Sequence, residues 1–347
     1  VQPAEETIVL CQQIRAGELD LSPQLPTFLT EEGARHRVDR PLFVAREQEL
    51  SRLDTFLTAA LAGQGRVILI TGGPGCGKTA LLDAFARRAM EAHADLLIAS
   101  GSCTAYSDVG DPYLPFRDVM AMLTGDVEAR WDAGAITREH AQRLWSALPL
   151  VVHALVDHGP HLVDVLVPGP ALLSRALAAG QDSPPWLSRL REYVGGQRTA
   201  LQDVEQSQLF QQATDLLRAV AQEQPVLLVL DDMQWADAAS IGLLFHLGRR
   251  LADADSRVLI ACAYRPEEVA LGRAGPSTLR QAQDGAGSGQ AQRHPLAKVL
   301  SEFKRAFGDV WVDLGRAEAA EGRSFVDTLL DSEPNRLPAG FRDGLFQ

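Results

Sequence analysis

Apolar residues in this chain gather in short unbroken runs, which alternate with segments where they recur every three or four positions. Unbroken runs of about 4–8 apolar residues next to glycine, proline or charge are typical of buried parallel strands. We expect helices at 46–65, 78–92 and 296–307. This alternation predicts an α/β fold with a parallel sheet and right-handed crossovers. The five expected strands are "RVILITG" (66–72), "ADLLIASGSC" (94–103), "PVLLVLDD" (225–232), "SRVLIACAYR" (256–265) and "DVWVDLG" (309–315).

Two long segments interrupt this alternation. Residues 105–222 have mostly helical spacing, with breaks at "DVGDP", "VPGP" and "GQDSPP", so they predict a large helical insertion between the second and third strands. Residues 271–295 are poor in apolar residues and rich in Gly, Ala and Gln. We therefore expect a long disordered loop between the fourth strand and the helix at 296–307.

A phosphate-binding motif joins the first strand to the helix at 78–92. The sequence "GGPGCGKT" (72–79) matches G-x-x-x-x-G-K-[ST] in the expected context, directly after a buried strand and before a helix. Glycines let backbone N–H groups surround an anion, and the helix N-terminus adds positive potential. Lys78 would reach the β- and γ-phosphate oxygens, and the Thr79 hydroxyl would ligate Mg²⁺. The expected nucleotide-binding residues are Gly72, Gly73, Pro74, Gly75, Cys76, Gly77, Lys78, Thr79 and Ala80.

Charged residues end the third and fourth expected strands, at the sheet edge where ligands bind in open α/β folds. Asp231 is expected to hold Mg²⁺ through its water shell, and Asp232 to orient or deprotonate the attacking water. If the fourth strand lies between the first and third, Arg265 would emerge beside the γ-phosphate. The candidate catalytic residues are therefore Lys78, Asp232 and Arg265. A plain turn or helix cap would also explain the two acids, and a surface position would also explain the arginine.

Composition narrows the class of protein. The net charge of −12 does not favour binding to nucleic acid or anionic lipid. Four scattered cysteines without a CxxC pair predict reduced thiols in a cytoplasmic protein, and no apolar run is long enough for a membrane span. Asn335 is the single asparagine, so the Asn-Lys-x-Asp loop of common GTPases is absent and ATP is the expected nucleotide.

Four motifs together carry a family resemblance. "LFVAREQELSRL", "GGPGCGKT", "LLVLDDMQWAD" and "AYRPEE" resemble the STAND/AAA-type ATPase modules of large bacterial transcriptional and signalling regulators, such as LuxR-like and MalT-like activators, over about residues 41–331. The resemblance implies a P-loop NTPase of the ASCE type with sheet order fifth, first, fourth, third, second. It places Arg46 of "VARE" against the adenine, although Ala45 replaces the usual glycine, and it makes Arg265 a sensor of the γ-phosphate.

The same resemblance gives a domain organisation. Residues 42–315 would form the ATPase domain, and 316–347 the start of a truncated helical lid. Residues 1–20 resemble the last helix of a TPR-like bacterial transcriptional activator domain, and the proline-containing stretch 21–41 is expected to be a linker. We expect the chain to be a fragment of a larger regulator, which would contact DNA only through parts absent here.

Three functions remain open at this point. The first is an ATP-dependent switch that hydrolyses ATP slowly and changes how neighbouring domains of the regulator pack. The second is a nucleotide-stabilised scaffold without useful turnover, which would bind a protein partner through residues 105–222. The third is a phosphotransferase, for which the sequence shows no acceptor pocket.

Overall fold

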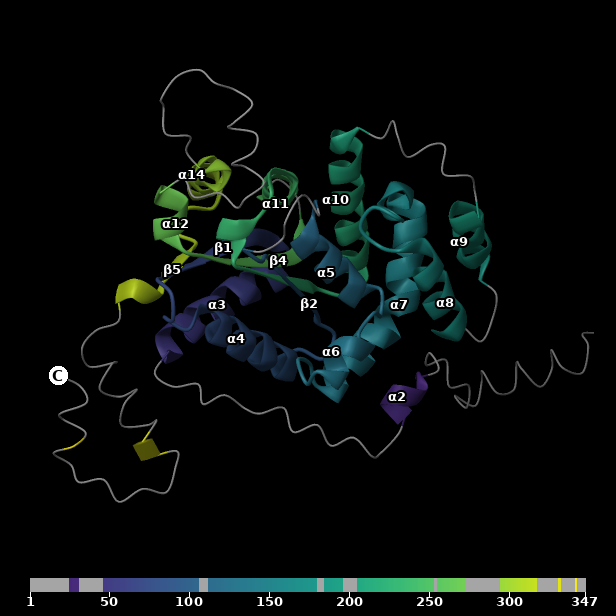
Figure 1. Cartoon of the computed structure of the whole chain (residues 1–347), viewed down its shortest axis with the longest axis horizontal. Helices are drawn as coiled ribbons and strands as arrows, with labels where there is room; N and C mark the ends of the chain where they lie inside the picture. The colour runs from purple at the N-terminus through teal and green to yellow at the C-terminus, as the bar shows by residue number, and fades with distance from the viewer. Residues whose placement is uncertain are drawn as a thin grey trace, which may run out of the picture.

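A five-stranded sheet lies at the centre of the molecule, with helices on both faces and further helices beyond one edge (Figure 1). The structure is a computed structural model that describes residues 25–30, 46–105, 112–179, 184–195, 205–252, 255–271, 294–316, 330, 331 and 341.

The strand order is β2-β3-β4-β1-β5, and every neighbouring pair is parallel. Counted from the other edge, this is the expected order 5-1-4-3-2, so the predicted P-loop NTPase sheet is confirmed. Each of the three inner strands contains a continuous run of buried apolar residues because helices cover both faces. The last strand is shorter than the sequence predicts. The strands are β1 (Gln64–Thr71), β2 (Leu97–Ser102), β3 (Val226–Asp231), β4 (Ser256–Tyr264) and β5 (Trp311–Asp313).

Long helices pack against each of the two faces of the sheet (Figure 1). On the first face are α3 (Glu47–Leu61), whose buried stripe includes Leu50, Leu53 and Leu57, and α4 (Lys78–Ala92). The opposite face carries α10 (Gln206–Glu223), α11 (Ala238–Ala252) and α14 (Pro295–Phe307). The short elements at the strand ends are η3 (Met233–Trp235), α12 (Pro266–Ala270) and η4 (Leu314–Arg316).

The segment between β2 and β3 is helical, as the sequence predicts. Its helices α5, α7 and α10 contact the sheet directly, and the others lie beyond the edge strand β2 (Figure 1). Within the described part of this segment, the only β pairing is an isolated bridge between Val163 and Val167. The remaining elements are α5 (Leu114–Leu123), α6 (Glu128–Asp132), α7 (Arg138–His158), η1 (Pro160–Leu162), α8 (Gly169–Ala179) and α9 (Pro185–Gly195).

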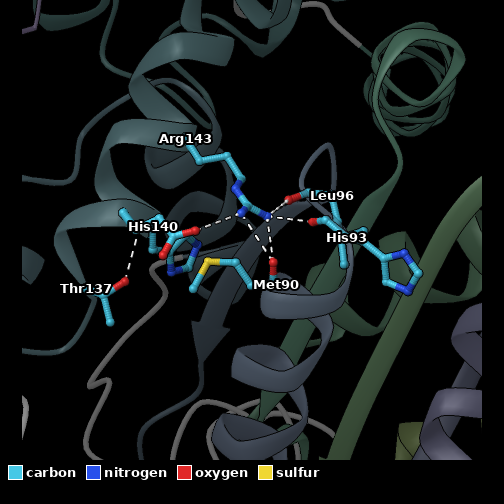
Figure 2. A network of polar contacts seen from close by, with 7 residues as sticks. Met90, His93, Leu96, Thr137, His140 and Arg143 are labelled. Atoms are coloured by element: carbon cyan, nitrogen blue, oxygen red, sulfur yellow. Dashed lines mark hydrogen bonds and ion pairs between the residues drawn. The ribbon is translucent and has the colours of Figure 1, made fainter.

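The start of α7 attaches this helical segment to the core (Figure 2). Thr137 caps α7 by accepting the backbone N–H of His140 at 3.2 Å, and His140 Nε2 donates to the Ile98 carbonyl of β2 at 2.8 Å. The Arg143 guanidinium donates to the carbonyl oxygens of Met90, His93 and Leu96 at 3.2–3.3, 2.7 and 3.3 Å. Met90 lies in the last turn of α4, His93 directly follows this helix and Leu96 directly precedes β2. The Arg143 side chain therefore joins α7 to the C-terminal end of α4, the helix that begins at the phosphate loop.

Part of the expected linker packs onto the helical segment. Residues 27–30 form the one-turn helix α2 (Thr27–Thr30), and Leu29 is fully buried. Arg138 donates to the Leu29 carbonyl, and the Phe28 ring lies 5.8 Å from that of Trp131. Residues 25–30 therefore differ from the predicted linker because contacts with α6 and α7 order them.

Several sequence predictions lie outside the described residues: the helix within 1–20, nearly all of the expected disordered loop at 271–295, and nearly all of the expected lid at 316–347. At the end of that loop, His294 is buried and caps α14, so the helix begins one residue before the predicted position. In the part of the chain that the structure describes, no helix is long and apolar enough to cross a membrane.

Candidate functional site

The loop between β1 and α4 is open on one side and presents backbone N–H groups. Gly75 and Gly77 have φ of +77° and +82°, a left-handed conformation that is strained for any residue with a Cβ. A Cβ at either glycine would meet no atom within 4 Å, so this side of the loop is open. Within the described residues, the N–H groups of Gly75, Gly77 and Lys78 donate no hydrogen bond. Such donors at a helix N-terminus fit a bound phosphate group.

Lys78 places its ammonium group inside this loop. The side chain is only 7% exposed, and Nζ donates to the carbonyl oxygens of Gly72 and Gly73, each at 2.9 Å. Phosphate oxygens are stronger acceptors for an ammonium group than neutral carbonyls are. The loop thus holds a buried cation at the position that phosphate binding requires.

Thr79 and Asp231 form the direct link between the loop and the strand β3. The Thr79 hydroxyl donates to Oδ2 of Asp231 at 2.5 Å, although the two residues are 152 positions apart. Burial raises the pKa of the Asp231 carboxyl, while the hydrogen bonds from Thr79 and from the Asp232 N–H act in the opposite direction. A hydroxyl and a partly buried carboxylate side by side are the oxygen donors that suit Mg²⁺.

Asp232 and Arg265 face each other at the same sheet edge. Arg265 follows β4, which lies between β1 and β3, as the sequence-based argument requires. Its Nη2 is 3.6 Å from Oδ1 of Asp232, and the two side chains are 29% and 34% exposed. Asp232 has a φ of +53°, an uncommon conformation for a residue other than glycine.

The sequence analysis did not predict the role of a buried glutamine that contacts both Asp232 and Arg265. Gln234 is fully buried, and its Nε2 donates to Oδ1 of Asp232 at 2.7 Å. Its Oε1 accepts the Arg265 backbone N–H at 3.1 Å, and its carbonyl accepts Nε2–H of His294 at 3.0 Å. The sequence feature that could have indicated the burial of Gln234 is its position between Met233 and Trp235, both of which pack against the core.

Arg46 lies close to the phosphate loop. Its Nη1 pairs with Glu49 at 2.8 Å, and its Nη2 donates to the Leu314 carbonyl at 3.5 Å. The Cβ of Leu314 in turn lies 3.2 Å from the position that a Cβ on Gly72 would occupy. The contact of Arg46 with an adenine stays a prediction.

The remaining residues of the expected binding set lie in the same loop. Cys76 is a free, half-buried cysteine. Its Sγ lies 3.7 Å from the position that an added Cβ would occupy on Gly72 or on Gly73. Its side chain therefore packs against the loop. Pro74 is exposed, and Ala80 is in the first turn of α4. The structure thus brings together every residue that the sequence analysis nominated, whereas their roles in binding and catalysis stay predictions.

The model of the AAA ATPase domain family (AAA_16) matches residues 42–260, which is more than half of the chain. The chain therefore belongs to this family of P-loop NTPases. The match includes the phosphate loop, the helical segment, Asp231 at the end of β3 and Asp232 after it, whereas Arg265 and His294 lie beyond the match. No curated protein matches the chain.

Proposed function

We propose that this chain is the ATP-binding and ATP-hydrolysing switch module of a multidomain bacterial transcriptional or signalling regulator. The observation that carries the proposal is the bond between Thr79 and Asp231 beside the buried ammonium of Lys78. It joins the phosphate loop to the strand β3, which ends at Asp231 and is followed by Asp232. Family membership supports nucleotide binding and, more generally, hydrolysis.

Each polar group of the site has a task in this proposal. The unpaired N–H groups of the loop and the ammonium of Lys78 would bind the phosphate chain. Thr79 and Asp231 would hold Mg²⁺, which when bound neutralises phosphate charge. Asp232 would orient a water molecule and accept its proton. Arg265, across from Asp232, would stabilise the negative charge on the transferred group.

The absence of an Asn-Lys-x-Asp loop supports ATP over GTP, because the chain has a single asparagine, Asn335. The position of Arg46 beside the loop is compatible with its expected contact with the adenine.

The attachment of α7 to α4 supports a switch rather than a passive scaffold. α4 begins at the phosphate loop, and its last carbonyls are held by Arg143 of the helical segment. A shift of α4 on nucleotide binding would therefore reach this segment, which is the proposed surface for a protein partner. Under this proposal, 42–315 is the motor of the regulator and DNA is contacted elsewhere.

Phosphate release from ATP tests the proposal. The wild-type protein should release phosphate slowly in the presence of Mg²⁺, and Asp232→Asn should lower kcat by about 100-fold or more while ATP still binds. Equal turnover by Asp232→Asn would reject Asp232 as the base. Tight ATP binding by the wild-type protein without any phosphate release would favour the scaffold.

A further inference from the structure

Gln234 uses both ends of its buried amide. Burying an amide is unfavourable unless each polar atom finds a partner, so a glutamine that is fully buried points to a need for its hydrogen bonds. Here Nε2 donates to Asp232 at 2.7 Å and Oε1 accepts the backbone N–H of Arg265 at 3.1 Å. An apolar side chain of the same length would fill the space but would leave the Arg265 N–H without an acceptor.

The amide can adopt only one orientation in this network. The Arg265 N–H requires an acceptor, so Oε1 must face it and the NH₂ group must face Asp232. The opposite orientation would bring the amide oxygen against a carboxylate and an amide donor against another donor. The network therefore specifies a donor, and not an acceptor, next to Asp232.

This donor determines which oxygen of Asp232 is free. Oδ1 accepts from Gln234 and faces Nη2 of Arg265 at 3.6 Å. In the described part of the chain, Oδ2 of Asp232 accepts no hydrogen bond, and both contacts of this carboxylate are at Oδ1. With Oδ1 held in this way, Oδ2 is the oxygen that remains available to a water molecule.

The main chain of Gln234 is fixed as well. Its carbonyl accepts Nε2–H of His294, whose Nδ1 accepts the Leu296 N–H at the start of α14. Because Nδ1 is an acceptor and Nε2 a donor, this buried histidine is neutral, and burial lowers its pKa accordingly. Gln234, within η3, is thus attached both to the end of β4 and to the start of α14.

We propose that Gln234 is a positioning residue for hydrolysis: it holds Asp232 so that Oδ1 faces Arg265 and Oδ2 receives the attacking water. The proposal rests on the proposed ATPase function. Gln234 does not itself contact ATP; it acts through the orientation of Asp232 and through the backbone of Arg265.

Gln234→Glu tests this role with almost no change in shape. The carboxylate still accepts the Arg265 N–H, but its second oxygen then lies against Oδ1 of Asp232. At this distance the two carboxylates share a proton at low pH and repel each other once both are ionised at high pH. We expect kcat to fall by about 10–100-fold at pH 8 and to recover partly toward pH 6, with the ATP dissociation constant changed less than about threefold.

Two further variants separate positioning from a structural role. Gln234→Met removes both hydrogen bonds without adding a titratable group, so it should lower kcat at every pH by a similar factor. Gln212→Glu makes the same chemical change in α10, where Gln212 bonds His161 at 2.7 and 3.0 Å, and it should leave kcat and its pH profile unchanged.

The outcomes are distinct. A wild-type pH profile and kcat in Gln234→Glu would overturn the positioning role. So would a parallel loss of ATP binding and melting temperature in both Gln234 variants, which indicates a structural residue only. If the wild-type protein binds ATP but releases no phosphate, the proposed hydrolysis fails first, and the role of Gln234 falls with it.

Discussion

Replacing Arg143 with alanine should loosen the helical segment from the phosphate-loop helix by an amount that the contacts allow us to estimate. Arg143 is 13% exposed and donates to three backbone carbonyls (Figure 2), one of them at 2.7 Å. A short bond from a charged donor contributes about 1.5–3 kcal/mol, and the longer bonds at 3.2–3.3 Å about 0.5 kcal/mol each. A cation at a helix C-terminus adds about 0.3–1 kcal/mol.

These contributions predict that the free energy of unfolding falls by about 3 kcal/mol in Arg143→Ala. Urea unfolding measures this loss directly, and thermal unfolding should show a decrease of about 6–12 °C in Tm. Arg143→Lys keeps the charge but not the planar fork, so it should lose about half as much. Arg305→Ala is the matched control, because that side chain is 77% exposed and its pair with Glu302 should contribute little. A loss below about 1 kcal/mol in Arg143→Ala, or one equal to that of Arg305→Ala, would refute the reasoning.

Three further changes have defined outcomes. In Gly101→Ala the new Cβ would lie 1.9 Å from the Pro115 carbonyl oxygen, so α5 must move away from β2. The free energy of unfolding should therefore fall by about 3 kcal/mol, and an unchanged denaturant midpoint would contradict this expectation. Thr79→Val removes the hydroxyl bonded to Asp231 and should weaken the Mg²⁺ dependence of ATP binding by about tenfold, as titrations with Mg²⁺ and with EDTA would show. Burial lowers the pKa of His140 in the folded protein. Below about pH 6.5 this histidine is therefore protonated more fully in the unfolded chain than in the folded protein, so the free energy of unfolding should fall as pH decreases. His140→Gln should make the decrease in Tm between pH 7.5 and 5.5 smaller; an unchanged decrease would argue against this assignment.

Local signals in the sequence were sufficient for most of the fold. The inner strands contain continuous apolar runs, and the phosphate loop is a contiguous motif, so both could be located without knowledge of the tertiary structure. The strand order came from the family resemblance, which places β4 between β1 and β3. Since Asp231, Asp232 and Arg265 lie at the ends of strands whose order the resemblance implies, their convergence near the loop could be anticipated.

The contacts that the sequence did not predict join residues that are far apart along the chain. α2 is one turn long, too short for a helical period, and it is ordered by contacts such as that between Phe28 and Trp131. Gln234 meets Arg265 and His294 at separations of 31 and 60 residues. A single glutamine or arginine has many possible partners, so the network around Gln234 and the attachment by Arg143 became visible only in three dimensions.

Equilibrium titration of the protein with Mg²⁺-ATP tests the central claim most directly. We predict saturable binding that Lys78→Ala weakens by about 10–100-fold, since this change removes charge-assisted bonds to phosphate. Asp232→Asn should bind within a few fold of the wild-type protein, because Asp232 is assigned to water and not to the nucleotide. Equal affinity in Lys78→Ala and the wild-type protein, or no binding by the wild-type protein, would contradict the account.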